Sequence, residues 1–345
     1  MKRLLASATF GLCFLYCASD CLPDSAVEAA VTGSLLSKLS GKPPAISVGG
    51  KSAAEIKAKI KSGKLKRVNP PRSLPEGVKE TDDVEYGRGG DKPLLLDLFQ
   101  PSENRQAVPG LIFVHGGSWN HGTRKIYHYY CEHFAKEGCV AATIEYRLSG
   151  KAPFPAAIQD VKCAIRWMRA NSKKLGVDPN KIGLVGGSAG GHLVLLAAYA
   201  NNDDPELEGS GGYGGTSSRV QAVVDLYGPA QLKGRRTPSV VKFLGGKTSD
   251  EAPELYAKAS PMTYLTKDAP PTLILHGTVD ELVAIAQSDQ LAARLSKLGV
   301  PYLYDRQEGW HHGMDAVAEV NVRCVWFMDQ FLAQVLPLPK SGAGR

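Results

Sequence analysis

The segment from Lys181 to Leu193 constrains the fold of this 345-residue chain more than any other stretch. It joins a short apolar run to a run rich in Leu and Ala, which predicts a strand over 182–185 and a helix over 189–200. Between them, Gly-Gly-Ser-Ala-Gly is typical of a sharp strand-to-helix turn that holds a serine hydroxyl clear of the backbone. Such a turn crowds the backbone, so it favours glycine two residues before and two residues after Ser188. The chain has 37 glycines, so the motif needs support from other segments.

Short apolar runs alternate with amphipathic segments along the rest of the chain. This alternation predicts an α/β fold, with a mostly parallel central sheet and helices on both faces. Two segments break the rhythm, 201–218 and 231–263, and both are candidates for a small cap over the site. We predict a hairpin of strands 83–86 and 94–99, strands at 111–114, 140–146, 182–185, 220–226, 272–275 and 302–305, and helices at 125–136, 155–174, 189–200, 285–298 and 316–335.

The N-terminal residues have the layout of a signal peptide. Lys2 and Arg3 precede an apolar run from Leu4 to Tyr16, which is too short to span a bilayer as a helix. We therefore predict a signal peptide over 1–19, export after cleavage and no integral membrane segment. The remaining domain prediction is a flexible basic lead-in over 20–80, an α/β catalytic domain over 81–337 and a disordered tail over 338–345.

The formal net charge of +7 is concentrated in one stretch. Between Lys51 and Arg72 there are eight basic residues and one acid, a net of 8 − 1 = +7, and the remainder holds 33 of each sign. A neutral body argues against a nucleic-acid-binding core. We interpret the basic stretch, which lacks aromatic residues, as a solvated linker; contact with an anionic polymer or a lipid surface is the alternative.

The cysteines and histidines show no metal-ligand spacing. Of seven cysteines, five follow the predicted leader and none forms a Cys-x-x-Cys pair. Disulfides and buried free thiols both remain open. His121, His128 and His133 are irregularly spaced and lack a clear set of acidic partners, so we predict no metal site.

A serine needs a base to take its proton and a third group to orient that base. Downstream of Ser188, Asp280 follows the strand that ends in His276, and His311 and His312 follow the last strand. The order Ser, Asp, His is the one expected for this kind of sheet. We predict a catalytic triad of Ser188, Asp280 and His312.

Alternatives remain for two of these three positions. His312 is preferred over His311 because Gly313 lets its loop approach the serine closely. Asp280 is preferred as the acid, with Glu281 next to it and Asp225 at the end of an earlier strand as rivals.

The strand at 111–114 runs into His115-Gly116-Gly117, the loop type that supplies N–H donors to an oxyanion. We predict an oxyanion hole from the backbone N–H groups of Gly117 and Ala189, with Gly116 as a further donor. His115 is predicted to brace this loop, and Trp119 to line the pocket or to pack in the core. His276 is predicted to be a hydrogen-bonded turn residue, and Arg147 and Asp160 to form a scaffolding ion pair.

Together these motifs resemble the α/β-hydrolase esterases and lipases, and more narrowly the bacterial carbohydrate-ester and feruloyl-esterase-like, BD-FAE-type branch. The resemblance runs from about Asp83 to Leu336. Glu145 stands where that family often has Asp, and Ala284 where it often has Pro. The matching stretches are 114–117, 145–148, 154–161, 186–192, 260–261 and 276–280.

The resemblance implies a serine carboxylic-ester hydrolase that acts through an acyl-enzyme and needs no metal or organic cofactor. The implied substrates are small-molecule or polysaccharide-linked esters, with short acyl, acetyl or feruloyl groups on carbohydrates. A serine aminopeptidase of the prolyl-oligopeptidase type is the alternative. Such peptidases usually carry a propeller domain, which nothing before Glu80 could form. A non-catalytic binding module is disfavoured because all three triad residue types are present.

Overall fold

The computed structural model describes residues 31–68, 73–103, 107–200 and 204–338. The predicted signal peptide and residues 339–345 of the predicted tail lie outside these ranges. In the described part of the chain, no helix is both long enough and apolar enough to cross a membrane.

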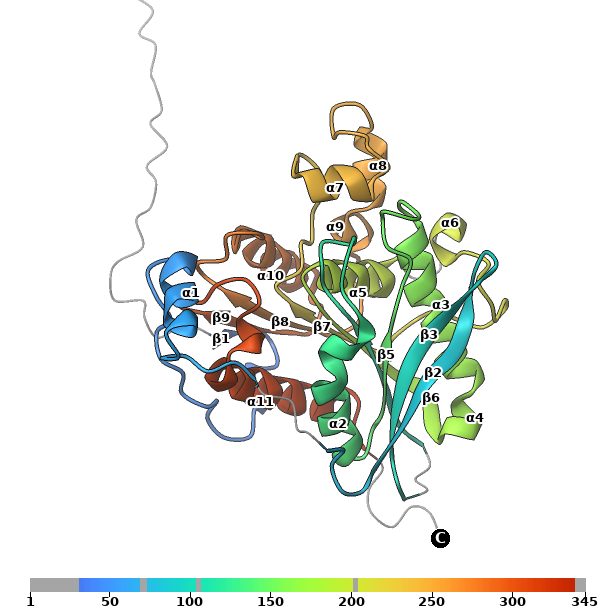
Figure 1. The fold of residues 1–345 in the computed structure, drawn as a ribbon, viewed down its shortest axis with the longest axis horizontal. Helices are drawn as coiled ribbons and strands as arrows, with labels where there is room; N and C mark the ends of the chain where they lie inside the picture. The colour runs from blue at the N-terminus through green and yellow to red at the C-terminus, as the bar shows by residue number, and fades with distance from the viewer. Residues whose placement is uncertain (1–30, 69–72, 104–106, 201–203, 339–345) are drawn as a thin grey trace, which may run out of the picture.

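A nine-stranded sheet forms the centre of the molecule (Figure 1), with strand order β1-β9-β8-β7-β6-β4-β5-β3-β2. Strands β4 to β9 are mutually parallel, whereas β1 and β3 pair antiparallel with β9 and β5, and β2 with β3. This confirms the mostly parallel sheet predicted from the sequence. The bounds are β1 Val31–Thr32, β2 Val78–Gly89, β3 Lys92–Pro101, β4 Val108–Val114, β5 Val140–Ile144, β6 Val177–Gly187, β7 Ala222–Leu226, β8 Thr272–Gly277 and β9 Tyr302–Gln307.

The strand register brings the carboxyl ends of the central strands to one edge. Val114 is level with Gly186, Gly187 with Leu226, and Leu226 with Leu275. Loops that follow β4, β6, β7 and β8 therefore begin side by side, which is where parallel sheets bind ligands.

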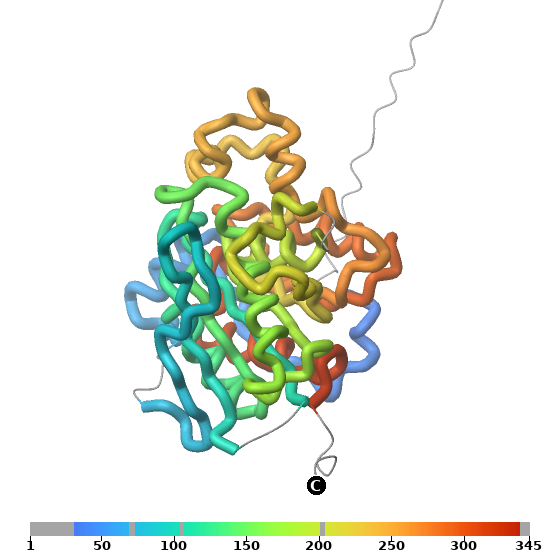
Figure 2. Tube along the Cα trace, turned by 90° about the vertical axis from the view of Figure 1, so that its right-hand side faces the viewer, coloured from blue at the N-terminus to red at the C-terminus, as the bar shows by residue number. Residues whose placement is uncertain are grey.

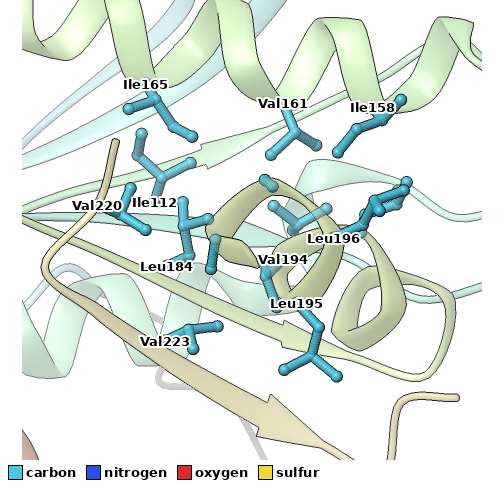
Figure 3. Close-up of a cluster of buried hydrophobic side chains, with 14 of the residues drawn as sticks. Ile112, Ile158, Val161, Ile165, Leu184, Val194, Leu195, Leu196, Val220 and Val223 are labelled. Carbon is cyan, nitrogen blue, oxygen red and sulfur yellow. The ribbon is translucent and has the colours of Figure 1, made fainter. Parts of the chain in front are cut away.

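Helices cover both faces of the sheet, each over its own hydrophobic core. On one face α3 and α5 pack on strand residues such as Ile112, Leu184 and Val223, as Figure 3 shows, and α10 joins them. On the other face α2 and α11 bury aromatic residues, and α1 adds Ile56. The bounds are α1 Ala53–Lys61, α2 His128–Lys136, α3 Ala156–Ala170, α4 Ser172–Leu175, α5 Ala189–Tyr199, α10 Ala286–Leu298 and α11 Ala318–Val335, with 3₁₀ turns η1 Leu36–Lys38, η2 Arg124–Tyr127 and η3 Met314–Ala316.

Only one of the two cap candidates forms a cap. Segment 231–263 folds into α7 Pro238–Phe243, α8 Pro253–Lys258 and α9 Pro261–Tyr264, of which α7 and α8 project from the body in Figures 1 and 2. The described part of 201–218, which includes α6 Pro205–Glu208, instead packs on α3. Glu208 pairs there with Lys162 at 2.7 Å and Arg166 at 2.9 Å, so its charge anchors the segment away from Ser188.

The predicted flexible lead-in is also corrected, because residues 31–68 pack on the domain. β1 extends the sheet beside β9, and Ile56 is fully buried against the core under α11. Trp310 donates its indole N–H to Ser47 O at 3.0 Å, and Arg323 donates to Pro44 O at 2.8 Å. The many charged residues of this segment favoured the prediction of a solvated linker. Its few apolar residues are nevertheless enough to pack it on the domain.

All cysteines in the described part of the chain are buried free thiols: Cys131, Cys139, Cys163 and Cys324. The question left open by the sequence is thereby answered for these four residues.

Candidate active site

Ser188 lies at a strained turn between β6 and α5. Its backbone has φ 57° and ψ −120°, a conformation costly for a residue with a Cβ atom. The turn is fixed by a hydrogen bond from Ser188 N–H to Leu226 O at 2.8 Å. A Cβ atom at Gly190 would lie 1.9 Å from Val114 O, and one at Gly186 would lie 2.5 Å from Gly190 O. Only glycine fits at these two flanking positions.

His312 lies between the serine and a carboxylate. Its Nε2 is 2.8 Å from Ser188 Oγ, and its Nδ1 is 2.7 Å from Asp280 Oδ2. A carboxylate accepts a hydrogen bond from Nδ1–H, which leaves Nε2 free to accept the serine proton. The ring of Tyr227 packs edge-on against the imidazole, with centroids 4.7 Å apart. Three residues from three separate loops thus form one hydrogen-bonded chain.

The Asp280 side chain is buried, and both of its carboxylate oxygens accept hydrogen bonds. Its Oδ1 accepts the backbone N–H groups of Leu282 and Val283, each at 2.8 Å. Its Oδ2 accepts from His312 and from His276 Nε2, the latter at 3.0 Å. Burial alone would raise the pKa of Asp280, but the hydrogen bonds from the two histidines hold that pKa well below its usual value. The carboxyl is therefore an anion able to orient the imidazole.

The alternatives Asp225, Glu281 and His311 are not part of the hydrogen-bonded chain from Asp280 to Ser188. The Asp225 carboxyl is buried where it accepts Gly228 N–H at 2.8 Å, and burial raises its pKa well above the ordinary range. Glu281 forms an ion pair with Lys57 of α1. The His311 side chain is buried, its Nδ1 has no hydrogen-bond partner within the described residues, and burial lowers its pKa.

The predicted oxyanion loop lies against the serine turn. A Cβ atom at Gly116 would be 2.8 Å from Gly187 O and 3.2 Å from Ser188 Cβ, so this backbone passes directly over the nucleophile candidate. Gly117 has φ +113°, and its carbonyl accepts two loop N–H groups, from Asn120 and His121. Ala189 is the first residue of α5, and N–H groups in the first turn of a helix have no partner within the helix.

Side chains behind the loop hold it in place. His115 Nδ1 is 2.7 Å from Gly116 O, its ring stacks on Tyr146 at 4.5 Å, and burial lowers its pKa to about 4. Trp119 both packs and lines a pocket: its ring stacks on Phe243 of α7 at 4.6 Å and its N–H donates to His192 Nδ1. The cap is thereby tied to the serine turn.

In the part of the chain that the structure describes, two hollows open on Ser188. A cleft of about 550 Å³ elsewhere, near Arg124 and Arg147, does not reach the serine. The larger hollow at the serine, about 510 Å³, we call the His312 cleft; it is lined by Arg67, Gly116, Gly117, Ser118, His121, Gly122, Ile126, Tyr127, Gly187, Ser188, Tyr227, Leu282, His312 and Gly313. The smaller, about 140 Å³, we call the cap pocket; it is lined by Ser118, Trp119, Ser188, Ala189, Pro229, Arg235, Thr237, Ser239, Val240, Leu282 and Val283.

The packed lead-in holds the loop that carries His312. Gly50 N–H donates to Gly309 O at 2.8 Å, and Ala318 N–H donates to Lys66 O at 2.8 Å on the far side of the loop. Together with the Trp310–Ser47 hydrogen bond, these contacts brace both ends of the segment that contains the imidazole.

Sequence reasoning missed two groups at the site. Arg67 reaches the His312 cleft from a segment that was interpreted as a linker. Tyr227, at φ 46°, contacts His312, and its hydroxyl donates a hydrogen bond to the buried Asp315. Its place directly after β7 was the available signal, because residues after parallel strands face the site.

Other predicted contacts are present as expected. Arg147 and Asp160 form an ion pair with a shortest N–O distance of 2.7 Å, and Asp160 is buried. His276 is a hydrogen-bonded residue at the end of β8, and one of its partners is Asp280 itself. Two of the three histidines that were expected to lack acidic partners do have one, since His128 lies 2.8 Å from Asp97 and His133 lies 2.8 Å from Asp329, whereas His121 contacts Asn120.

Comparison with known proteins identifies the family. The BD-FAE family matches residues 96–295, which is more than half of the chain. The chain belongs to the BD-FAE family of α/β-hydrolases. Esterase LipC of Mycobacterium tuberculosis is 38% identical over 239 residues, covering 66% of this chain and 58% of LipC. Esterase LipQ of the same organism is 34% identical over 282 residues, covering 79% of this chain and 66% of LipQ. The chain therefore spans less than two thirds of the length of these relatives.

Solved structures of esterases share the fold of this BD-FAE member. A truncated carbohydrate esterase from gut microbiota superposes with a TM-score of 0.66 at 28% identity, over 76% of this chain and 99% of that one. A thermophilic esterase from Thermogutta terrifontis gives a TM-score of 0.66 at 27% identity, over 82% of this chain and 99% of that one.

Proposed function

We propose that this chain is a serine carboxylic-ester hydrolase that works through an acyl-enzyme formed on Ser188. The observation that carries the proposal is the hydrogen-bonded chain Ser188–His312–Asp280, with N···O distances of 2.8 and 2.7 Å, of which Ser188 and His312 line the His312 cleft. Its relatives named as esterases support the same reaction class.

In this mechanism His312 Nε2 takes the hydroxyl proton as Ser188 Oγ bonds to the ester carbonyl carbon. The electron pair moves onto the carbonyl oxygen, which accepts hydrogen bonds from the N–H groups of Gly116, Gly117 and Ala189. As the carbon–oxygen bond to the alcohol breaks, the imidazolium returns its proton to that oxygen. Water then repeats the sequence on the acyl-enzyme, releasing the acid. Asp280 stays ionised throughout and stabilises the imidazolium.

The position of His312 distinguishes the two halves of the site. The leaving alcohol must lie within reach of Nε2 to receive its proton, so it occupies the His312 cleft. The cap pocket touches Ser188 and Ala189 without touching His312, and it therefore takes the acyl group.

The size of the cap pocket favours short acyl groups. The cap pocket holds about 140 Å³, well below the roughly 300–1,000 Å³ of pockets that enclose drug-sized ligands. We infer acetyl to butyryl esters as preferred substrates, with a carbohydrate as the alcohol and feruloyl esters disfavoured. Propionate and butyrate are bound in structures of the Thermogutta esterase, which supports a short acyl pocket here.

We also propose that the protein is exported. The proposal rests on the basic residues and apolar run at the start of the sequence. N-terminal sequencing of the secreted chain tests it, with a start near residue 20 expected and retention of Met1 contradicting it.

Hydrolysis of p-nitrophenyl acetate, butyrate and octanoate tests the reaction and the pocket together. We expect acetate and butyrate to be cleaved with much higher kcat/KM than octanoate, and Ser188→Ala to lower turnover by about 10⁶. Ester cleavage that survives in Ser188→Ala would refute the mechanism. Cleavage of an aminoacyl-nitroanilide without ester cleavage would support the peptidase alternative.

A further inference from the structure

Arg67 is fixed at the rim of the site by backbone contacts on both sides. It forms an isolated antiparallel bridge with Val317, and Val68 N–H donates to Ala316 O at 2.9 Å. These partners lie just beyond the loop that carries His312. The position of Arg67 is therefore set by the same segment that positions the imidazole.

The Arg67 side chain is exposed and lines the His312 cleft together with Ser188 and His312. Within the described residues, its guanidinium forms neither an ion pair nor a hydrogen bond. No carboxylate is among the residues that line this cleft. An adjoining hollow is lined by both Arg67 and Asp315. However, the Asp315 carboxyl is buried, it accepts a hydrogen bond from Tyr227, and burial raises its pKa. The cleft thus holds a cation with no countercharge.

Residues close to Arg67 in the chain carry further positive charge. Lys57 and Lys59 are paired with Glu281 and Glu55. The exposed Lys61, Lys64 and Lys66 form no ion pair in the described part of the chain. An excess of one sign beside a cleft attracts ligands of the other sign.

We propose that Arg67 is a specificity residue that binds a carboxylate on the alcohol half of the ester, as in an acylated uronic-acid residue. The inference rests on the proposed ester hydrolysis, in which the alcohol half lies on the His312 side. A guanidinium presents paired N–H donors that match the two oxygens of a carboxylate. Arg67 does not touch the reacting atoms; it selects which alcohol is bound.

Two matched probes test the proposal: para-acetoxybenzoate and para-acetoxybenzamide, acetyl esters whose leaving groups differ in carrying a carboxylate or a neutral amide. In Arg67→Gln we expect kcat/KM for the carboxylate probe to fall about fivefold more than for the amide probe. Arg67→Lys should retain part of the preference. Raising the salt concentration should weaken the preference of the native enzyme.

Lys66→Gln is the matched control. Lys66 is next to Arg67 in the chain and carries the same charge, but its side chain does not line the cleft. The control substitution lowers only the long-range attraction, so it should change the ratio between the two probes much less than Arg67→Gln does. An equal fall for both probes in Arg67→Gln, no fall for either, or an equal change of the ratio in Lys66→Gln would overturn the proposal. If the native enzyme cleaves neither these probes nor p-nitrophenyl acetate, the proposed hydrolase function itself fails.

Discussion

His276 Nε2 lies 3.0 Å from Asp280 Oδ2, the same oxygen that accepts from His312 at 2.7 Å. His276 is itself held by Ser288 Oγ at 2.7 Å and Val283 O at 2.9 Å. All of these groups except His312 are fully buried or nearly so. The acid of the proposed triad is therefore held from behind by a second imidazole that does not reach the serine.

We predict that His276→Phe lowers kcat roughly tenfold to a hundredfold with little change in KM. The substitution removes a hydrogen bond to a buried carboxylate, which costs about 1–3 kcal/mol and weakens the orientation of His312. Steady-state kinetics on p-nitrophenyl acetate measure it. His276→Gln, which keeps an N–H donor, should recover part of kcat. A rise in KM at constant kcat would show that His276 acts on substrate binding instead.

Three carboxyl substitutions distinguish the candidate acids. Asp280→Asn should lower kcat roughly 10⁴-fold, because the amide leaves His312 in the wrong tautomer. Asp225→Asn and Glu281→Gln should each lower it by less than about tenfold, since neither side chain is hydrogen bonded to the imidazole. The same esterase assay, applied to the three variants, shows which carboxyl orients the imidazole. A loss in Asp225→Asn as large as that in Asp280→Asn would reassign the acid.

Asp225 should also leave a signature in the pH dependence of stability. Burial raises its pKa in the native state, so between the unfolded value near 3.9 and the higher native value only the unfolded chain has lost the proton. The native state consequently loses stability as pH rises through that window. The amide side chain of the Asp225→Asn variant does not titrate. The unfolding free energy of this variant minus that of the unsubstituted protein should therefore rise from pH 4 to pH 7. Urea unfolding at several pH values measures this difference; a constant difference would mean that the native pKa is not raised.

The packing of the lead-in predicts a large effect of a single substitution far from the site. Ile56 is fully buried, and Ile56→Ala should lower the unfolding free energy of the domain by roughly 2–5 kcal/mol. Ala54, on the same helix and not among the buried residues, provides the control: Ala54→Ser should change it by less than about 1 kcal/mol. Urea unfolding with a single transition measures both. If Ile56→Ala and Ala54→Ser are equally harmless, the lead-in does not fold with the domain.

The sequence predicted those parts of the molecule that local pattern determines. The alternation of strands and helices gave the sheet, and the glycines around Ser188 gave the turn, because each depends on residues that are close in the chain. Gly313 beside His312 favoured, of two adjacent histidines, the one that contacts Ser188 in the structure.

Features that depend on distant partners were missed. Nothing near Ser47 shows that its carbonyl accepts a hydrogen bond from Trp310, and nothing near Val31 shows that it pairs with Asp305 in β9. The segment after α5 was expected to cover the site, but Glu208 finds two buried cations on α3 instead. Tertiary charge pairing and a few apolar anchors decided these placements.

The most direct test of the account is covalent labelling with an alkyl fluorophosphonate, with the adduct located by mass spectrometry of peptides. We predict one adduct on Ser188, formed at a rate that falls at least a hundredfold in His312→Ala and by far less in His311→Ala, since only His312 is 2.8 Å from the serine oxygen. An adduct on another residue, or labelling of Ser188 at the native rate in His312→Ala, would contradict the assignment of Ser188 as a nucleophile activated by His312.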